Sequence, residues 1–180
     1  MSTGLQGFRC QREGLTIRGT VFLPEGRPGE RFPAAILCHE FMANQLFSYP
    51  YAKTLAQCGY AAFCFDFCGG GLISASEGSS RKMSVRTEMA DLKAVMQFAC
   101  KQDYTVGKPP LLVGCSQGGL VAALAAAEQP QNVRGLILLY LAKKRAEGKH
   151  YNVAISHAAK KLVRLIYAME KSQQPYRPAA

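Results

Sequence analysis

The stretch Gly114-Cys115-Ser116-Gln117-Gly118-Gly119 carries the strongest structural signal in the sequence. It follows the short apolar run 111–113 and opens an alanine-rich segment that is typical of a helix. In a Gly-X-Ser-X-Gly pattern between a strand and a helix, the serine lies on a tight turn, and the two glycines leave room for the crowded backbone. The pattern predicts that Ser116 presents its hydroxyl at the carboxyl end of a sheet, where open α/β sheets place their sites.

The same position has a second interpretation. Serine is a preferred N-cap residue, because its side-chain oxygen can accept a hydrogen bond from a backbone N–H in the first turn of a helix. Ser116 could therefore be a helix cap between a strand and a helix, without any chemical role.

The rest of the chain up to residue 142 alternates between strand and helix patterns. Continuous apolar strands separated by helices indicate a mostly parallel sheet that is covered by helices on both faces. Residues 7–23 predict an antiparallel strand pair that ends at a Leu-Pro-Glu-Gly turn. The further strands are predicted at 34–39, 60–67, 110–115 and 133–141, and the helices at 49–58, 84–102 and 117–128. For the second of these helices, Ser84 gives only an imperfect N-cap signal, because Glu88 is one residue beyond capping-box spacing.

The loop after the first of these parallel strands begins Cys38-His39-Glu40-Phe41. A loop at this place can aim a backbone N–H toward Ser116. Together with the backbone N–H of Gln117 it would form an oxyanion hole, which often contributes the largest single effect in acyl transfer. His39 fits a structural histidine at a strand end better than a general base.

A glycine-rich loop, Asp66-Phe67-Cys68-Gly69-Gly70-Gly71, follows the next strand. It lacks both the spacing of a dinucleotide-binding loop and the Lys-Ser/Thr pair of a P-loop, so we do not assign phosphate binding to it. We expect Asp66 to brace the loop rather than to act in catalysis.

Composition places the chain among ordinary globular proteins. It has 180 residues, of which 48% are hydrophobic and 19% are charged, and this composition excludes disorder along the whole chain. The longest apolar run, 136–142, is too short to span a membrane, and residues 1–10 lack the apolar core of a secretory signal. Seven cysteines without a CxxC pair indicate reduced thiols in the cytoplasm; a metal site at Cys64 and Cys68 lacks a second ligand pair. We expect no metal and no cofactor.

Residues 7–142 resemble the N-terminal part of an α/β-hydrolase of the serine esterase and aminopeptidase type. The matching stretches are LCHEF, YAKTLAQCGYAAFCFDFCGGG, VGCSQGGLVAALAAAEQP and VRGLILLY. Ser-Gln-Gly-Gly at the turn is similar to small bacterial carboxylesterases, including the cinnamoyl and feruloyl esterases. The resemblance implies a serine hydrolase that cleaves small carboxylic esters through an acyl-enzyme. It implies Ser116 as the nucleophile, the backbone N–H groups of Phe41 and Gln117 as the oxyanion hole, and Gly114 and Gly118 as the glycines of the turn.

The sequence departs from this family at three places. Glu40 stands where the family usually has glycine, so we expect strain in the loop and a carboxylate near the developing oxyanion. Cys68 stands where the family often has arginine. In this fold the acid and the histidine of the triad follow the serine, but no aspartate follows Asp103; Glu147 and His150 are the only substitute pair that we single out. We therefore expect impaired catalysis.

Residues 143–180 have a different character. They hold nine Lys/Arg and two Asp/Glu, a net charge of +7, out of +10 for the whole chain. This tail resembles the C-terminal end of transposases of the IS110/IS116 group, which implies that a mobile element interrupted the hydrolase frame. Within the tail, 153–171 predicts an amphipathic helix. The alternative function is thus an inactive, truncated chimera whose basic tail binds nucleic acid or only forms a solvated face. We leave the oligomeric state open.

Overall fold

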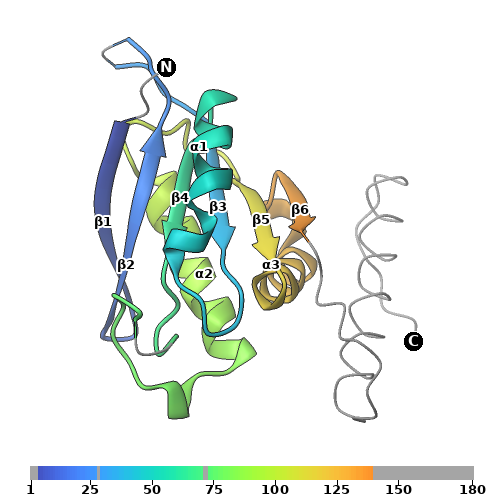
Figure 1. Ribbon diagram of the computed structural model, residues 1–180. Helices are drawn as coiled ribbons and strands as arrows, with labels where there is room; N and C mark the ends of the chain where they lie inside the picture. Colours follow the sequence, from blue (N-terminus) through green and yellow to red (C-terminus); the bar gives the residue numbers. More distant parts are fainter. Residues whose placement is uncertain (1–3, 28, 71–72, 140–180) are drawn as a thin grey trace, which may run out of the picture.

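A six-stranded sheet forms the centre of the molecule (Figure 1). The computed structural model describes residues 4–27, 29–70 and 73–139. The strand order is β1-β2-β4-β3-β5-β6, in which β3, β4, β5 and β6 run parallel and the β1–β2 hairpin joins antiparallel through β2. The strands are β1 Gly4–Arg12, β2 Leu15–Leu23, β3 Ala34–Cys38, β4 Ala61–Phe65, β5 Leu111–Cys115 and β6 Gly135–Leu139. The predicted parallel sheet and hairpin are confirmed, although β1 begins three residues before the predicted start.

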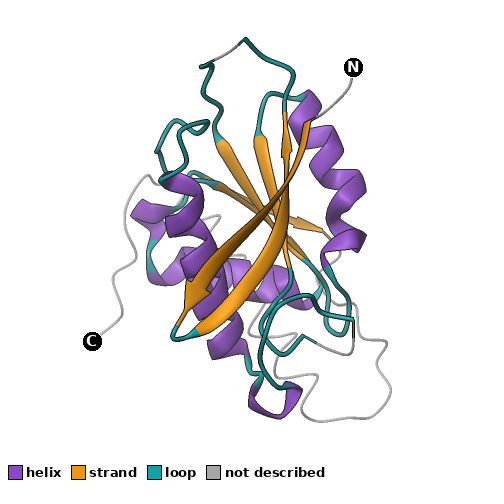
Figure 2. Ribbon diagram, turned by 90° about the vertical axis from the view of Figure 1, so that its left-hand side faces the viewer, coloured by secondary structure: helices purple, strands orange, loops and turns teal. Residues whose placement is uncertain are grey.

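Helices cover both faces of this sheet (Figure 2). The helix α1 packs on one face, and α2 and α3 pack side by side on the other. Their bounds are α1 Tyr49–Gln57, α2 Val85–Cys100 and α3 Gln117–Glu128, with short 3₁₀ helices η1 Gln45–Ser48, η2 Ser80–Lys82 and η3 Pro130–Asn132. The predicted mostly parallel α/β class with two covered faces is confirmed.

The cap of α2 differs from the sequence prediction. Ser84 is the N-cap, but its partner is Thr87: the Ser84 side chain accepts from the Thr87 N–H, and the Thr87 hydroxyl accepts from the Ser84 N–H. Threonine thus replaces the usual Glu or Gln of the capping box. Glu88 turns into the interior instead, and it is 1% exposed.

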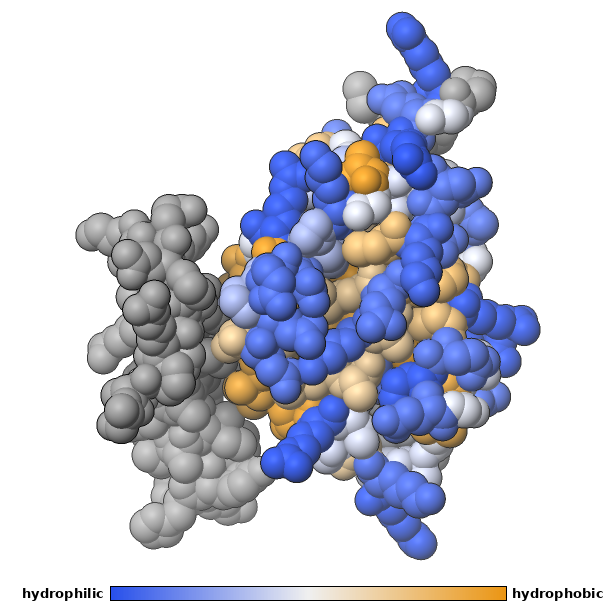
Figure 3. All heavy atoms as spheres, turned by 180° about the vertical axis from the view of Figure 1, so that it is seen from behind, coloured by the Kyte–Doolittle hydropathy of each residue, from blue (hydrophilic) through white to orange (hydrophobic). Residues whose placement is uncertain are grey.

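The core consists of two apolar layers, one on each face of the sheet. All residues of β3 and β4 are buried, as continuous apolar strands in a doubly covered sheet should be. Phe63 and Phe65 on β4 are fully buried, and each contributes about 1.5–3 kcal/mol by leaving water. Seen from behind, the face of α2 and α3 shows hydrophilic side chains with apolar ones between them (Figure 3).

Within the described residues, β1 and β6 are the two outer strands. The strand β6 is only partly covered, and Ile137 is 40% exposed. The predicted strand continued to residue 141, and residues 140–141 lie outside the described residues, as do the predicted tail helix and the pair Glu147 and His150.

Candidate active site

Ser116 lies on the turn between β5 and α3, as predicted. Its backbone has φ 51° and ψ −113°, a left-handed conformation that costs a non-glycine residue about 1–3 kcal/mol. An N-cap residue normally has extended backbone instead, and within the described residues the Ser116 side chain makes no capping hydrogen bond. The alternative interpretation of Ser116 as a helix cap therefore lacks its defining contact.

The two glycines of the turn stand where no side chain fits. A Cβ on Gly114 would lie 2.6 Å from the carbonyl oxygen of Gly118, and a Cβ on Gly118 would lie 2.5 Å from that of His39. The first contact shows that the end of β5 and the first residues of α3 lie directly against each other. The second shows that the start of α3 packs directly against the main chain that follows β3, so the turn and the loop carrying Phe41 are neighbours.

His39 is held by two backbone groups. Its Nδ1 lies 2.7 Å from the carbonyl oxygen of Glu40, and its Nε2 lies 3.4 Å from the N–H of Phe67. The first contact requires a proton on Nδ1 and the second a lone pair on Nε2, so the neutral ring satisfies both. Burial lowers the pKa of His39, which favours this neutral form. These contacts agree with the predicted structural role of His39.

The loop after β3 carries its strain at an unexpected residue. Met42 has a φ of 58°, whereas Glu40 is not among the residues with positive φ. The left-handed residue of the loop is thus Met42, two positions after Glu40, the residue from which strain was expected. Phe41 is 59% exposed at the surface of this loop.

Asp66 braces two loops, as predicted. One carboxylate oxygen accepts from the N–H of Gln45 at 2.6 Å, and the other accepts from the N–H of Ala75 at 2.8 Å. Asp66 thereby ties the loop after β3 to the glycine-rich loop after β4. Its carboxylate is occupied by main-chain donors, which fits a structural role.

Sequence reasoning missed a buried carboxylate beside the turn. Both oxygens of Glu88 lie within hydrogen-bonding distance of Nε2 of Gln117, at 3.0 and 2.8 Å. Burial raises the pKa of Glu88 to about 7, opposed by this hydrogen bond and assisted by the charge of Asp91. The available signal was helical spacing, because Glu88 precedes the core residue Leu92 by one turn.

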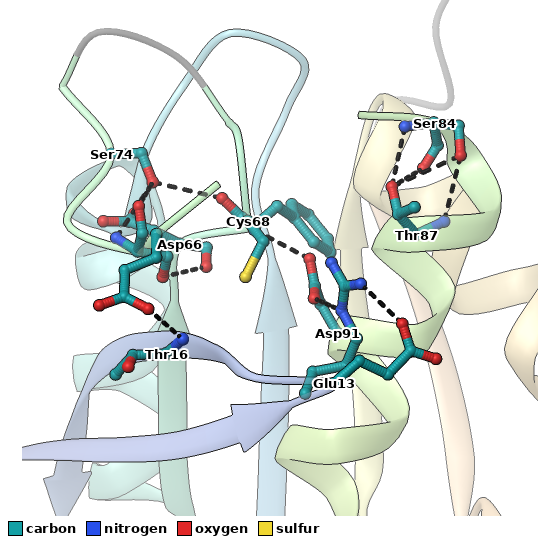
Figure 4. A network of polar contacts seen from close by, with 12 residues as sticks. Glu13, Thr16, Asp66, Cys68, Ser74, Ser84, Thr87 and Asp91 are labelled. Atoms are coloured by element: carbon teal, nitrogen blue, oxygen red, sulfur yellow. Dashed lines mark hydrogen bonds and ion pairs between the residues drawn. The ribbon is translucent and has the colours of Figure 1, made fainter. Parts of the chain in front are cut away.

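A second buried carboxylate, Asp91, pairs with a cation. Its Oδ1 accepts from Nε of Arg12 at 2.7 Å, and its Oδ2 accepts from the N–H of Cys68 at 2.8 Å (Figure 4). Three elements thus meet at Asp91: β1, the loop after β4, and α2. Ala75 is thus held by Asp66 and Cys68 by Asp91, so both of these loop residues are anchored at the end of the sheet that carries Ser116.

The sequence matches the model of a known protein family over most of its length. The model of the Hydrolase_4 family, described as serine aminopeptidase, S33, matches residues 32–174. The chain belongs to this α/β-hydrolase family. The match covers the turn of Ser116 and the loops around it, and it extends past residue 142 into the basic tail. No match was found among curated protein sequences.

Solved structures of this hydrolase class share the fold. The α/β hydrolase GrgF from Penicillium sp. sh18 is 25% identical, with a TM-score of 0.66 over 75% of this chain and 45% of that one. Est1E from Butyrivibrio proteoclasticus, solved with ferulic acid bound, is 24% identical with a TM-score of 0.64, over 72% and 50% of the two chains. The thioesterase domain of the curacin biosynthetic pathway is also 24% identical, with a TM-score of 0.63, over 85% and 50%. The chain therefore spans about half the length of these structures.

Some of the predicted site residues lie close together in the structure, and two of them lie outside the described residues. The structure brings together Ser116, Gln117 and the loop of Phe41, and it places both turn glycines in close contact with their neighbours. The predicted substitute pair, Glu147 and His150, lies outside the described residues.

None of the helices within the described ranges is long and apolar enough to cross a membrane.

Proposed function

We propose that this chain is a serine hydrolase that cleaves carboxylic esters through an acyl-enzyme on Ser116. The observation that carries the proposal is the backbone of Ser116, a non-glycine residue held at φ 51° between a strand and a helix. Such strain persists where the surrounding structure enforces it, and it clusters at active sites. Membership of the family supports the same reaction class.

The chemistry follows the general route of acyl transfer. The Ser116 oxygen bonds to the ester carbonyl carbon, and the carbonyl electron pair moves onto oxygen. The backbone N–H groups of Gln117 and Phe41 would stabilise that oxyanion. The C–O bond to the alcohol then breaks, and the alcohol leaves with the proton that the serine has lost. Water attacks the acyl-enzyme in the same manner and regenerates the serine hydroxyl.

The surface near the turn favours an apolar substrate. Large apolar side chains with more than half of their area exposed lie on the two segments that Asp66 ties together, from the loop after β3 into η1 and in the loop after β4. Exposed apolar groups of this size commonly mark binding surfaces. They suit a small ester with an aliphatic or aromatic acyl group. These residues are Phe41, Met42, Leu46, Phe47 and Ile73.

We further propose that turnover by this chain is slow. His39 is the one histidine among the described residues, and both of its ring nitrogens contact backbone groups. A serine without a base is a poor nucleophile at neutral pH. Glu147 and His150 are the substitute acid and base that we propose to test.

Labelling with a fluorophosphonate probe tests the nucleophile. The serine oxygen bonds to phosphorus, the P–F bond breaks, fluoride leaves, and the hydroxyl proton passes to a base or to solvent. We expect slow labelling of the wild type, none in Ser116→Ala, and an unchanged rate in the control Ser79→Ala. His150→Ala should slow labelling further if His150 is the base. Equal labelling of wild type and Ser116→Ala would refute the proposal, and fast stoichiometric labelling of Ser116 would refute only the slow turnover.

A second candidate function rests on the charge of residues 143–180. Their net charge of +7 favours contact with nucleic acid, against +3 for residues 1–142. Phosphate contacts release counterions, so the affinity for labelled duplex DNA should fall steeply between about 50 and 200 mM salt. Absence of binding at low salt would leave only a solvated basic face.

A further inference from the structure

Glu88 is a buried carboxylate that the proposed reaction does not use. It belongs to the first turn of α2, is 1% exposed, and has both oxygens within hydrogen-bonding distance of the side-chain amide of Gln117. Burying a charged group is costly unless it is hydrogen-bonded. The hydrogen bonds from the Gln117 amide reduce this cost for Glu88, and they also tie the Gln117 side chain to α2.

The position of Gln117 gives this contact its meaning. Gln117 is the first residue of α3 and directly follows the strained Ser116. Its backbone N–H is a proposed oxyanion donor. A side chain anchored to α2 restricts how far that residue can rotate, so a contact on the side chain also restrains the N–H.

The other charged and titratable groups near Glu88 have different partners. Asp91, one turn further along α2, is paired with Arg12 from β1. The buried Cys38 thiol on β3 is close enough for the charge of Glu88 to contribute to its raised pKa. On α3, Gln117 is the residue that meets the Glu88 carboxylate, and it is uncharged.

We propose that Glu88 is a positioning residue, whose carboxylate holds the Gln117 amide and thereby fixes the backbone N–H of Gln117 at the oxyanion site. The inference rests on the proposed function. Displacing an oxyanion donor costs up to two or three orders of magnitude in rate, and a shift of about 1 Å can cost about 100-fold. Glu88 therefore acts on the step in which the oxyanion forms, and leaves ground-state binding almost unchanged.

The test compares three variants of the full chain at pH 8, with fluorophosphonate as the probe. Glu88→Met removes the contact, and Glu88→Gln keeps an amide that can still bond Gln117. Glu128→Gln is the matched control, since Glu128 also links α3 to α2, through Lys93, at the far end of α3. We expect the maximal rate of inactivation to fall by about 10- to 100-fold in Glu88→Met, with the half-saturating probe concentration unchanged. Glu88→Gln and Glu128→Gln should remain within about threefold of the wild type.

Hydrogen–deuterium exchange of segment 114–120 provides a readout that does not require activity. Exchange should accelerate in Glu88→Met alone. If Glu88→Met and Glu128→Gln slow labelling equally, or if Glu88→Met retains both the wild-type rate and wild-type exchange, the positioning role is refuted. If no variant, including the wild type, is labelled, the proposed function fails, and exchange alone decides on the role of Glu88. If Glu88→Met does not fold, Glu88→Gln decides. A large loss of its maximal rate with wild-type exchange would refute the positioning role, because the rate would then fall although the segment 114–120 is still held in place.

Discussion

At the scale of single residues, α2 buries two carboxylates, and the fold gives them different hydrogen-bond partners. Within the part of the chain that the structure describes, Asp91 pairs with the Arg12 cation and a backbone N–H, whereas Glu88 contacts the neutral amide of Gln117 alone. Burial is the largest influence on both carboxylates and raises the pKa of each, to about 7 for Glu88. The consequence is a group that changes charge near neutral pH inside the folded protein.

The pH dependence of stability should reveal Glu88. Because the folded state raises its pKa from 4.5 to about 7, the folded state binds the proton more tightly than the unfolded chain. Stability is therefore lost as pH rises through this window, by at most about 3 kcal/mol. Glu88→Gln should lack the loss, so the variant gains on the wild type between pH 5 and pH 8 in urea unfolding. The control Glu77→Gln concerns an exposed carboxylate whose pKa is lowered by hydrogen bonds from Thr16, so its stability difference from the wild type should stay nearly constant between pH 5 and pH 8. An equal difference between wild type and Glu88→Gln at both pH values would contradict the assignment.

Arg12→Ala should destabilise the protein much more than Glu13→Ala does. Arg12→Ala leaves Asp91, whose side chain is 0% exposed, without its cation. Breaking a buried pair in this way costs about 3–5 kcal/mol. Glu13→Ala removes the exposed second partner of Arg12 and should cost less than about 1 kcal/mol. Urea unfolding of the two variants measures both values, and similar small losses would show that solvent reaches Asp91.

The sequence could predict the residues whose neighbours are close in the chain. Ser116, Gly114 and Gly118 are recognisable because the turn itself demands them. Glu88 was not recognised, because its partner Gln117 lies on another helix and becomes its neighbour only through tertiary packing. Asp91 and Arg12 illustrate the same limit, since 79 positions separate them.

At the scale of elements, apolar runs located the strands reliably, whereas helix ends depended on side-chain detail. The core of α2 was predicted from its apolar spacing, but its cap required knowing that Thr87 can replace a glutamate. A hydroxyl at the third position bonds the same N–H as a carboxylate, although it has a shorter reach.

The capping box gives a prediction for α2. Ser84→Ala removes the acceptor of the Thr87 N–H and should lower the free energy of unfolding by about 1 kcal/mol. Ser79→Ala is the matched control, because Ser79 precedes η2 without a side-chain cap bond. Thermal and urea unfolding of both variants check the difference. An equally small effect in the two variants would mean that α2 begins independently of its cap.

At the scale of the whole molecule, strand order is what the sequence could not supply. The strand β2 pairs with β4 rather than with the next strand along the chain, and β3 lies between β4 and β5. Apolar content marks each strand as buried without saying which neighbour it takes. The order matters for the site, since it brings the ends of β3 and β5 together and with them the loop of Phe41 and the turn of Ser116.

The outer position of β6 leads to a prediction about residues 143–180. Within the described residues β6 pairs only with β5, and Ile137 is 40% exposed. An apolar outer strand is prone to pair with another chain unless something covers or charges it. The tail sequence contains an apolar helical stripe that includes Ile155, Leu162 and Ile166, and we expect it to protect this edge.

Deleting residues 143–180 should therefore produce aggregation and binding of a dye that reports exposed apolar surface, measured by sedimentation and fluorescence. The shortened chain with Ile137→Lys should regain solubility, because a charge on an edge strand blocks further pairing. A shortened chain that is monomeric, binds no dye and melts at the wild-type temperature would show that the tail protects nothing. If the lysine has no effect on an aggregating chain, the exposed surface lies elsewhere than β6.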